Sequence, residues 1–400
     1  MSPGKIERPR GTHDILPSEQ RQWRRVTSEF ENLCALYGYR RIDTPVFEHT
    51  ELFVRTSGLG SDVVTKEMYT FADRSDRSLT LRAEATAPIV RAYLEHGLHR
   101  EPQPQKLYSI ASIYRYGRPQ KGRWREHWQL DVEAIGSHDP AVDAEVIQLY
   151  DTLLGRLGIR EYRLELNSIG DARCRPAYLE RLRPWLEEQA AGLDEATREQ
   201  AARNPLRALD NIAGKPPAVQ EVLRRAPSIA DALCDECRAH FADVCAYLDA
   251  FGVRYELVPT LVRGLDYYTR TTWEFLGPEG GSQSALSGGG RYDGLAEELG
   301  GRPTPGVGFG AGIERLLLAL EQADIVAPAE EGIDVFFVCA DGADRPRVLA
   351  KVLELRAAGL RADADFAGRS VKGQQTQAAR LGAKRIVVVD TDTDLAAVTP

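Results

Sequence analysis

Residues 112–136 read SIYRYGRPQKGRWREHWQLDVEAIG, and this stretch decides how the rest of the chain is interpreted. It predicts two β-strands joined by a basic turn, because Pro119 and Gly122 interrupt its middle as a hairpin connection requires. Beyond the turn, apolar and polar residues alternate, and successive side chains of a strand point to opposite faces. The apolar set is Trp128, Leu130, Val132 and Ala134, and the polar set is His127, Gln129, Asp131 and Glu133.

The turn itself is strongly basic. It holds five cations against one acid, Glu126; the cations are Arg115, Arg118, Lys121, Arg123 and Arg125. A cationic turn beside an acidic strand face can hold a phosphate and an ammonium group side by side. The plainer interpretation is a solvated hairpin with an ordinary polar outer face. Taken alone, the stretch leaves both interpretations open.

Length and charge limit the classes of protein that fit. A chain of 400 residues exceeds the size at which single cores stop growing, so we expect two or three domains. The content of 43% hydrophobic and 28% charged residues is typical of globular proteins. The net charge of −8 excludes a basic field over the whole molecule, so nucleic acid would have to meet a local patch such as residues 115–125.

The sequence offers no membrane or export signal. The first eleven residues lack an apolar segment, and apolar runs such as Val335 to Ala340 are too short to span a bilayer. The six cysteines show no disulfide framework. We therefore expect a cytoplasmic protein with no membrane partner.

Composition and periodicity predict four segments. Residues 1–170 mix strands and helices, whereas 171–252 are rich in Ala, Leu, Glu and Arg and predict a helical insertion. Strand patterns and a glycine-rich run return in 253–325, followed by an Ala/Pro/Glu-rich linker. Residues 331–400 show a strand–helix–strand–helix–strand order, which predicts a small α/β domain with parallel strands.

Five motifs occur in a fixed order along the chain. They are YGYRRIDTPVFE (37–48), YRYGRPQKGRWREHWQLDVEAIG (114–136), LVRGLDYYTRTTWEF (261–275), SALSGGGRYDGL (284–295) and GVGFGAGIERL (306–316). Together they resemble histidyl-tRNA synthetase, a class II aminoacyl-tRNA synthetase, over essentially the whole chain. The resemblance implies an α+β catalytic domain, with an antiparallel sheet flanked by helices and interrupted by the helical insertion. It also implies that the last segment is an α/β anticodon-binding domain, here shortened.

The reaction of this family requires cations around the α-phosphate of ATP. The carboxylate of histidine attacks the α-phosphorus of ATP, and the enzyme positions the reactants and neutralises negative charge. By resemblance, Arg115 and Arg263 are the catalytic cations, and ATP is bound by Arg115, Arg123, His127 and Arg315. Mg²⁺ is expected with the β- and γ-phosphates.

The resemblance also implies a histidine site. Glu84, Thr86 and Gln129 would surround the α-amino group, and Glu133 and Tyr268 would meet the imidazole with Tyr267 beside it. Arg115 and Arg263 complete this set. The family further implies tRNA(His) as substrate and a homodimer, whose interface is built by the segment YGYRRIDTPVFE.

Three positions depart from the family pattern. An acid usually stands where this chain has Gly117, and an aromatic ring for adenine usually stands at His127. Asp131 replaces a small residue, and it could either enter the histidine pocket or pair with a neighbouring arginine.

Two other functions fit the sequence less well. A synthetase-like regulatory subunit of ATP phosphoribosyltransferase would bind histidine without charging tRNA, but Arg263, Tyr267 and Tyr268 are intact here. The spacing of the glycines in 306–312 does not match a dinucleotide fingerprint, which argues against an oxidoreductase. Cys234 and Cys237 have metal-ligand spacing but no second cysteine pair, so no metal site is predicted.

Overall fold

The computed structural model describes residues 5–58, 61, 63–210, 212–278, 285–328 and 332–399. Two predicted boundaries, the start of the SALSGGGRYDGL motif at Ser284 and the start of the last domain at residue 331, lie outside the described residues. The chain forms two compact units, Met1–Val326 and Ala327–Pro400, and each is described by itself.

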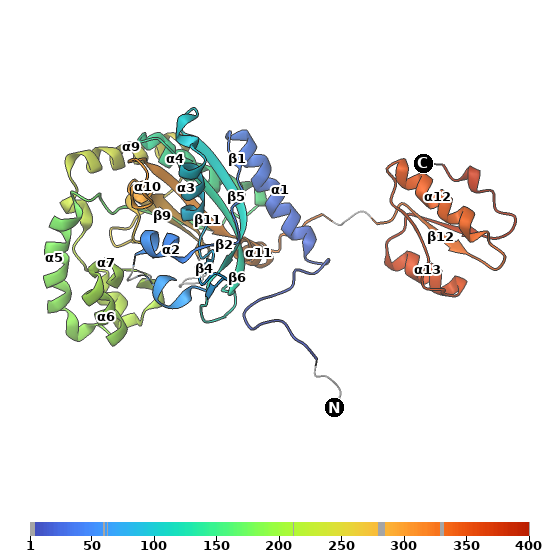
Figure 1. The fold of residues 1–400 in the computed structure, drawn as a ribbon, viewed down its shortest axis with the longest axis horizontal. Helices are drawn as coiled ribbons and strands as arrows, with labels where there is room; N and C mark the ends of the chain where they lie inside the picture. Colours follow the sequence, from blue (N-terminus) through green and yellow to red (C-terminus); the bar gives the residue numbers. More distant parts are fainter. Residues whose placement is uncertain are drawn as a thin grey trace. The chain divides into compact units, whose positions relative to one another are not determined.

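An eight-stranded sheet forms the centre of the first unit (Figure 1). Its order is β1 (Arg40–Arg41), β5 (Gln105–Tyr114), β6 (Glu126–Ile135), β11 (Gly306–Gly312), β10 (Ala285–Arg291), β9 (Thr269–Leu276), β7 (Arg163–Ser168) and β8 (Glu256–Leu257). The six inner strands are antiparallel, and only the short edge strands β1 and β8 pair in parallel. The predicted antiparallel class II sheet is therefore confirmed.

The first motif contributes two short strands. β1 covers only two residues, and β2 (Phe47–His49) begins after Pro45. Proline has no N–H to give to a ladder, which explains the break at this position. β2 belongs to a separate three-stranded sheet with β4 (Ser78–Leu81) and β3 (Thr70–Ala72).

The alternation predicted for β6 is present in the structure. Leu130, Val132 and Ala134 are fully buried in the main hydrophobic core. On the opposite face, the polar residues of β6 lie across the ladder from glycines of β11: Gln129 pairs with Gly312, Asp131 with Gly310 and Glu133 with Gly308. Glycines have no side chains to cover this face, so it remains accessible to a ligand.

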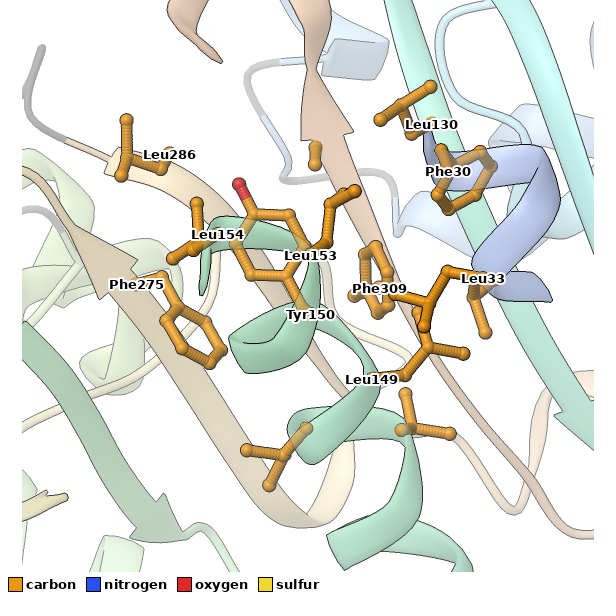
Figure 2. Packing of buried hydrophobic residues seen from close by; sticks show 14 of the residues in the cluster. Phe30, Leu33, Leu130, Leu149, Tyr150, Leu153, Leu154, Phe275, Leu286 and Phe309 are labelled. Atoms are coloured by element: carbon orange, nitrogen blue, oxygen red, sulfur yellow. The ribbon is translucent and has the colours of Figure 1, made fainter. Parts of the chain in front are cut away.

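Helices cover the apolar face of the sheet. They are α1 (Gln20–Leu36), α4 (Pro140–Leu157), α9 (Asp235–Phe251) and α11 (Ile313–Gln322). Figure 2 shows Tyr150 of α4 next to Phe309, with Phe30 and Leu33 of α1 on the far side. The ring of Tyr150 meets those of Phe275 and Phe309 edge-on, at centroid distances of 4.9 and 5.1 Å. This packing fixes the sheet on which the polar face is built.

A second core lies on the other side of the sheet. Here α3 (Thr86–Glu95) packs its Ile89, Val90 and Tyr93 with residues of β5 and with the insertion. α2 (Thr50–Ser57) and α10 (Leu295–Glu298) contact α3. α3 thus begins beside the open polar face.

Between β7 and β8, every regular element in the described residues is a helix. The α-helices that precede α9 are α5 (Arg175–Glu188), α6 (Glu195–Arg203), α7 (Pro205–Ala208) and α8 (Pro217–Leu223). They surround leucines such as Leu182 and Leu223, and the same core includes Tyr267 and Tyr268. The insertion is therefore packed against the segment that carries the RGLDYYT motif (Figure 1).

The second unit has the predicted β-α-β-α-β order. Its elements are β12 (Val335–Cys339), α12 (Arg345–Ala357), β13 (Ala362–Ala364), α13 (Val371–Arg380) and β14 (Arg385–Val389). β12 lies between β13 and β14 and is parallel to both. Across the described parts of both units, no helix combines the length and the hydropathy needed to cross a membrane.

Candidate active site

Two adjoining cavities lie over the polar face of the sheet. The larger extends towards the basic turn and α11, and the smaller towards α3 and Tyr268. Both are lined by the same five residues at their junction: Arg115, Gln129, Arg263, Gly288 and Gly310. Both predicted catalytic arginines therefore lie where the two cavities meet.

Arg115 follows directly after β5, and backbone contacts fix it there. Its Nε donates to the carbonyl of Ala83 at 2.7 Å, and its backbone N–H donates to the carbonyl of Arg125 at 2.8 Å. The guanidinium lines both cavities. A cation held in this way can neutralise an anion that spans the junction.

Arg263 approaches the junction from the other side. Its Nη1 lies 2.7 Å from a carboxylate oxygen of Glu274 on β9, and its buried Nε has no hydrogen-bond partner among the described residues. Burial alone would lower the pKa of Arg263, but Glu274 and the nearby Tyr268 raise it above its usual value. A Cβ added to Gly288 would lie 2.1 Å from Nη2 of Arg263, so the guanidinium lies directly over this glycine.

The larger cavity brings together the other residues predicted for ATP. Arg315, at the start of α11, donates from Nε to the carbonyl of Gly122 at 3.3 Å and thereby fixes the basic turn. Burial and the cations Arg115, Arg315 and Arg123 lower the pKa of His127 to about 3. His127 is therefore a neutral ring at physiological pH, which suits stacking on a base better than an imidazolium would.

An acid from elsewhere in the chain lies near Gly117. Glu67, in the π-helical turn Val63–Glu67, forms an ion pair with Arg123, and its carbonyl accepts from the backbone N–H of Tyr116 at 2.7 Å. A Cβ at Gly117 would lie 2.9 Å from Nε of Arg123. Nothing in the local pattern of the second motif pointed to Glu67, because the contact joins segments far apart in the sequence.

The smaller cavity brings together most of the residues predicted for histidine. Glu84, Thr86, Gln129, Tyr267 and Tyr268 line it, together with the two arginines. Glu84 accepts from the backbone N–H groups of Thr86 at 2.8 Å and Ala87 at 2.9 Å, at the start of α3. Burial raises the pKa of Glu84. The cavity therefore has acidic and hydroxyl groups at one end and the arginines at the other.

Glu133 is placed differently from the other predicted residues. It is fully buried, lies outside the cavity lining, and accepts from Thr86 Oγ1 at 2.6 Å and from the hydroxyl of Tyr292. Burial raises the pKa of Glu133 to about 8. Thr86 thus stands between Glu133 and the cavity. Tyr292 was not predicted as a site residue, although it lies two residues after Gly290.

Asp131 enters the cavity. Its side chain is buried and lines the smaller cavity, and its Oδ2 has no hydrogen-bond partner among the described residues. No ion pair joins it to an arginine in the described part of the chain, so of the two predicted alternatives the structure favours the first. Burial, together with Glu133 and Glu84, raises the pKa of Asp131 well above its usual value. Such a carboxylate is suited to a cationic ligand.

The two cysteines considered in the sequence have further neighbours. Cys234 and Cys237 lie beside Asp171 and Cys174, which come from the other end of the insertion. The predicted absence of a metal site stays a prediction at this point, but in three dimensions Asp171 and Cys174 place a second pair of potential ligands beside the two cysteines.

Comparisons with known proteins agree with this geometry. The family model described as histidyl-tRNA synthetase matches residues 11–316. A histidine–tRNA ligase of Moorella thermoacetica is 49% identical over 96% of this chain and 90% of its own length. The crystal structure of apo Staphylococcus aureus histidyl-tRNA synthetase superposes with a TM-score of 0.79 at 39% identity, covering 96% of this chain and 92% of that one.

A second solved structure shares the fold at lower identity. It is described as an ATP phosphoribosyltransferase regulatory subunit/histidyl-tRNA synthetase from Bacillus halodurans, and it is 23% identical with a TM-score of 0.70 over 98% of this chain and 100% of that one. At this identity the similarity concerns the fold alone. The family model covers most of the chain and the ligase relatives are far more similar, so this chain belongs to the histidyl-tRNA synthetase family.

Proposed function

We propose that the two cavities form one active site, in which L-histidine reacts with ATP to give histidyl-adenylate and pyrophosphate before histidine is transferred to tRNA(His). The observation that carries the proposal is the shared junction of the cavities. Arg115 and Arg263 line both of them, so an amino acid in the smaller cavity and a nucleotide in the larger would meet between two guanidinium groups.

The first step needs charge neutralisation more than proton transfer. A histidine carboxylate is already ionised, so it attacks the α-phosphorus directly while the bond to the β-phosphate oxygen breaks. Negative charge on the α-phosphate oxygens is then stabilised by Arg115, which follows β5, and by Arg263 from the opposite side. Fixed guanidinium groups lower the barrier because they do not have to reorganise as the transition state forms.

The larger cavity has the groups that ATP requires. His127 offers a neutral ring to adenine, and Arg315 and Arg123 offer guanidinium groups to the β- and γ-phosphates. Mg²⁺ prefers oxygen ligands. Glu274 and Glu314 are the carboxylates that line this cavity, and they would hold Mg²⁺ alongside the phosphates.

The smaller cavity fits both ends of histidine. Glu84, Thr86 and Gln129 would surround the ammonium group, and Asp131 supplies a further carboxylate for it. Tyr268 would meet the imidazole, and Glu133 would act on the ring through Thr86 or after a small movement towards the cavity. A site that pairs both ring nitrogens rejects apolar amino acids, because its polar groups would otherwise be left without partners.

Transfer to tRNA(His) and dimer formation complete the proposal. The α/β unit at Ala327–Pro400 has the order of elements expected of the anticodon-binding domain. Val46, Phe47 and Phe71 are 42%, 51% and 44% exposed, in and beside the first motif, and would be covered in a homodimer. Light scattering tests this, with a Phe47→Asp variant expected to shift the protein towards monomer.

The proposed activity is tested by histidine-dependent ATP–pyrophosphate exchange, followed by charging of tRNA(His) with the same preparation. Exchange and charging together are the expected result. Histidine binding without exchange would instead favour a regulatory protein that senses histidine. Exchange without charging would confine the proposal to adenylate formation.

A further inference from the structure

A second cluster of reactive side chains lies at the base of the helical insertion. Asp171, Cys174, Cys234 and Cys237 each present one potential ligand atom, and these four atoms all lie within 4.8 Å of one another. The chain supplies them as two matching pairs, Asp171-x-x-Cys174 and Cys234-x-x-Cys237. Pairs separated by two residues are the usual building blocks of tetrahedral sites with thiolate ligands.

Local backbone structure builds this cluster. Cys174 occupies the N-cap position of α5, and its backbone N–H donates to the carbonyl of Asp171 at 3.1 Å. Gly170 has a φ of +63°, and a Cβ at this position would lie 2.7 Å from Cβ of Cys174. The turn that presents the first pair therefore requires glycine.

The second pair is joined to the first by a backbone contact. Cys234 occupies the N-cap position of α9, and Cys237 lies in the first turn of that helix. The backbone N–H of Cys234 donates to Sγ of Cys174 at 3.1 Å. Backbone N–H groups that donate to sulfur are the outer-shell contacts that orient metal-bound thiolates. The N-termini of two helices point at the cluster, and their dipoles favour thiolate over thiol.

We infer that Asp171, Cys174, Cys234 and Cys237 bind one Zn²⁺ ion in a closed, structural site. Tetrahedral coordination with Zn–S bonds of about 2.3 Å places sulfur atoms about 3.8 Å apart, so movements of about 1 Å would bring these side chains to bonding distance. Three soft thiolates favour zinc over magnesium or calcium. A complete set of four protein ligands leaves no open position for catalysis.

The surroundings balance the charge of such a site. Three thiolates and one carboxylate around a divalent ion leave a net charge of −2. Arg173 contacts the carboxylate of Asp171 at 2.8 Å, and Arg270 lies 3.7 Å from it. A carboxylate has about four acceptor positions, so Asp171 can keep these contacts and still bind a metal ion.

The cluster is connected to the proposed active site. Arg175 follows Cys174 in the chain and donates a hydrogen bond from its guanidinium to the backbone carbonyl of Tyr268, which lines the smaller cavity. The backbone of Arg270 also pairs with the turn, because its N–H donates to the carbonyl of Gly170 at 2.7 Å. Zinc would therefore hold both ends of the insertion against the segment that carries Tyr268.

The experiment is to measure the metal content of the full-length protein, purified without chelators under reducing conditions, by mass spectrometry of the elements. We expect about one zinc ion per chain, and its loss in the Cys174→Ser and Cys237→Ser variants. Cys245→Ser is the matched control, because Cys245 lies on the same helix α9 outside the cluster and should leave the zinc content unchanged.

A second measurement keeps the inference testable if the serine variants do not fold. Co²⁺ added to the metal-free wild-type protein should give the absorption bands of tetrahedral thiolate ligation, and one equivalent of Zn²⁺ should abolish them. Wild-type protein without zinc that also fails to bind Co²⁺ would overturn the assignment. So would iron as the bound metal, or a disulfide between two of these cysteines in freshly purified protein.

The connection to Tyr268 predicts a particular kinetic effect. Removal of zinc should raise KM for histidine in pyrophosphate exchange more than KM for ATP, because only the smaller cavity adjoins the cluster. An equal effect on the KM values of both substrates in a folded metal-free protein would contradict the connection to Tyr268. Whether the four residues bind zinc is tested separately by the metal content.

Discussion

Arg263 and Glu274 form an ion pair, with 2.7 Å between Nη1 and the carboxylate oxygen, beside the junction of the two cavities. Glu274 comes from β9, whereas Arg263 lies in the preceding segment outside the sheet. The pair holds the guanidinium over Gly288, and Arg263 lines both cavities. This arrangement supports a role for Arg263 in stabilising a transition state, beyond binding a substrate.

The first prediction concerns this arginine. Arg263→Ala should lower histidine-dependent pyrophosphate exchange by about a hundredfold or more, while histidine still binds, because its charge matters most as negative charge develops. Exchange assays and calorimetry measure the two effects separately. Arg181→Ala is the control, since Arg181 is half exposed on the insertion and pairs only loosely with Asp231 at 3.8 Å. Unchanged exchange in Arg263→Ala would remove this residue from the mechanism.

A glycine substitution tests the position of the same guanidinium. In Gly288→Ala the new Cβ would lie 2.1 Å from Nη2 of Arg263, so the guanidinium must move away from the junction. We expect a loss of exchange activity of about a hundredfold, as a misplacement of about 1 Å can cause. Gly294→Ala is the matched control, because no heavy atom lies within 4 Å of its added Cβ. Equal activity of the two variants would show that the pose of Arg263 is not required.

Asp131 gives a prediction about affinity. Asp131→Asn keeps the shape of the side chain but removes its charge, so histidine should bind about tenfold more weakly, or about 1.4 kcal/mol. Calorimetry with histidine measures this effect. Affinity for ATP serves as the internal control, because Asp131 lines only the smaller cavity. Unchanged histidine affinity would mean that the ammonium group does not reach this carboxylate.

Much of the site could be predicted from the sequence, and the reason differs between residues. The period-two alternation in β6 placed Gln129 and Asp131 on one face, because side-chain direction in a strand is a local property. The roles of Arg263 and Arg315 could not come from periodicity. Their motifs are separated from β6 by many residues, and only the resemblance to a family brought them together.

Contacts between distant segments were missed for a physical reason. Glu67 with Arg123, Tyr292 with Glu133, and Cys174 with Cys234 each join segments that have no local pattern in common. Their proximity depends on the order of strands in the sheet and on the path of the insertion, and hydrophobic periodicity specifies neither. The cysteine cluster shows this most clearly, since one half of it precedes α5 and the other half begins α9.

The last prediction concerns pH. Burial raises the pKa of Glu133 from 4.5 to about 8, so the folded protein keeps this proton over a range in which the unfolded chain has lost it. Stability from this group is therefore fully present below about pH 4.5 and is lost as pH rises towards about 8. The contribution is on the order of a few kcal/mol.

Glu133→Gln replaces the protonated acid by a neutral amide of the same shape, which can accept from one of the hydroxyls of Thr86 and Tyr292 and donate to the other. The midpoint of urea unfolding should therefore fall less steeply between about pH 5 and about pH 8 in the variant than in the wild-type protein. Glu133 is one of the causes that raise the pKa of Asp131, so the difference between the two slopes measures Glu133 together with its effect on Asp131. Identical slopes would mean that Glu133 is already ionised in the folded protein, and its hydrogen bonds to Thr86 and Tyr292 would then be those of a carboxylate.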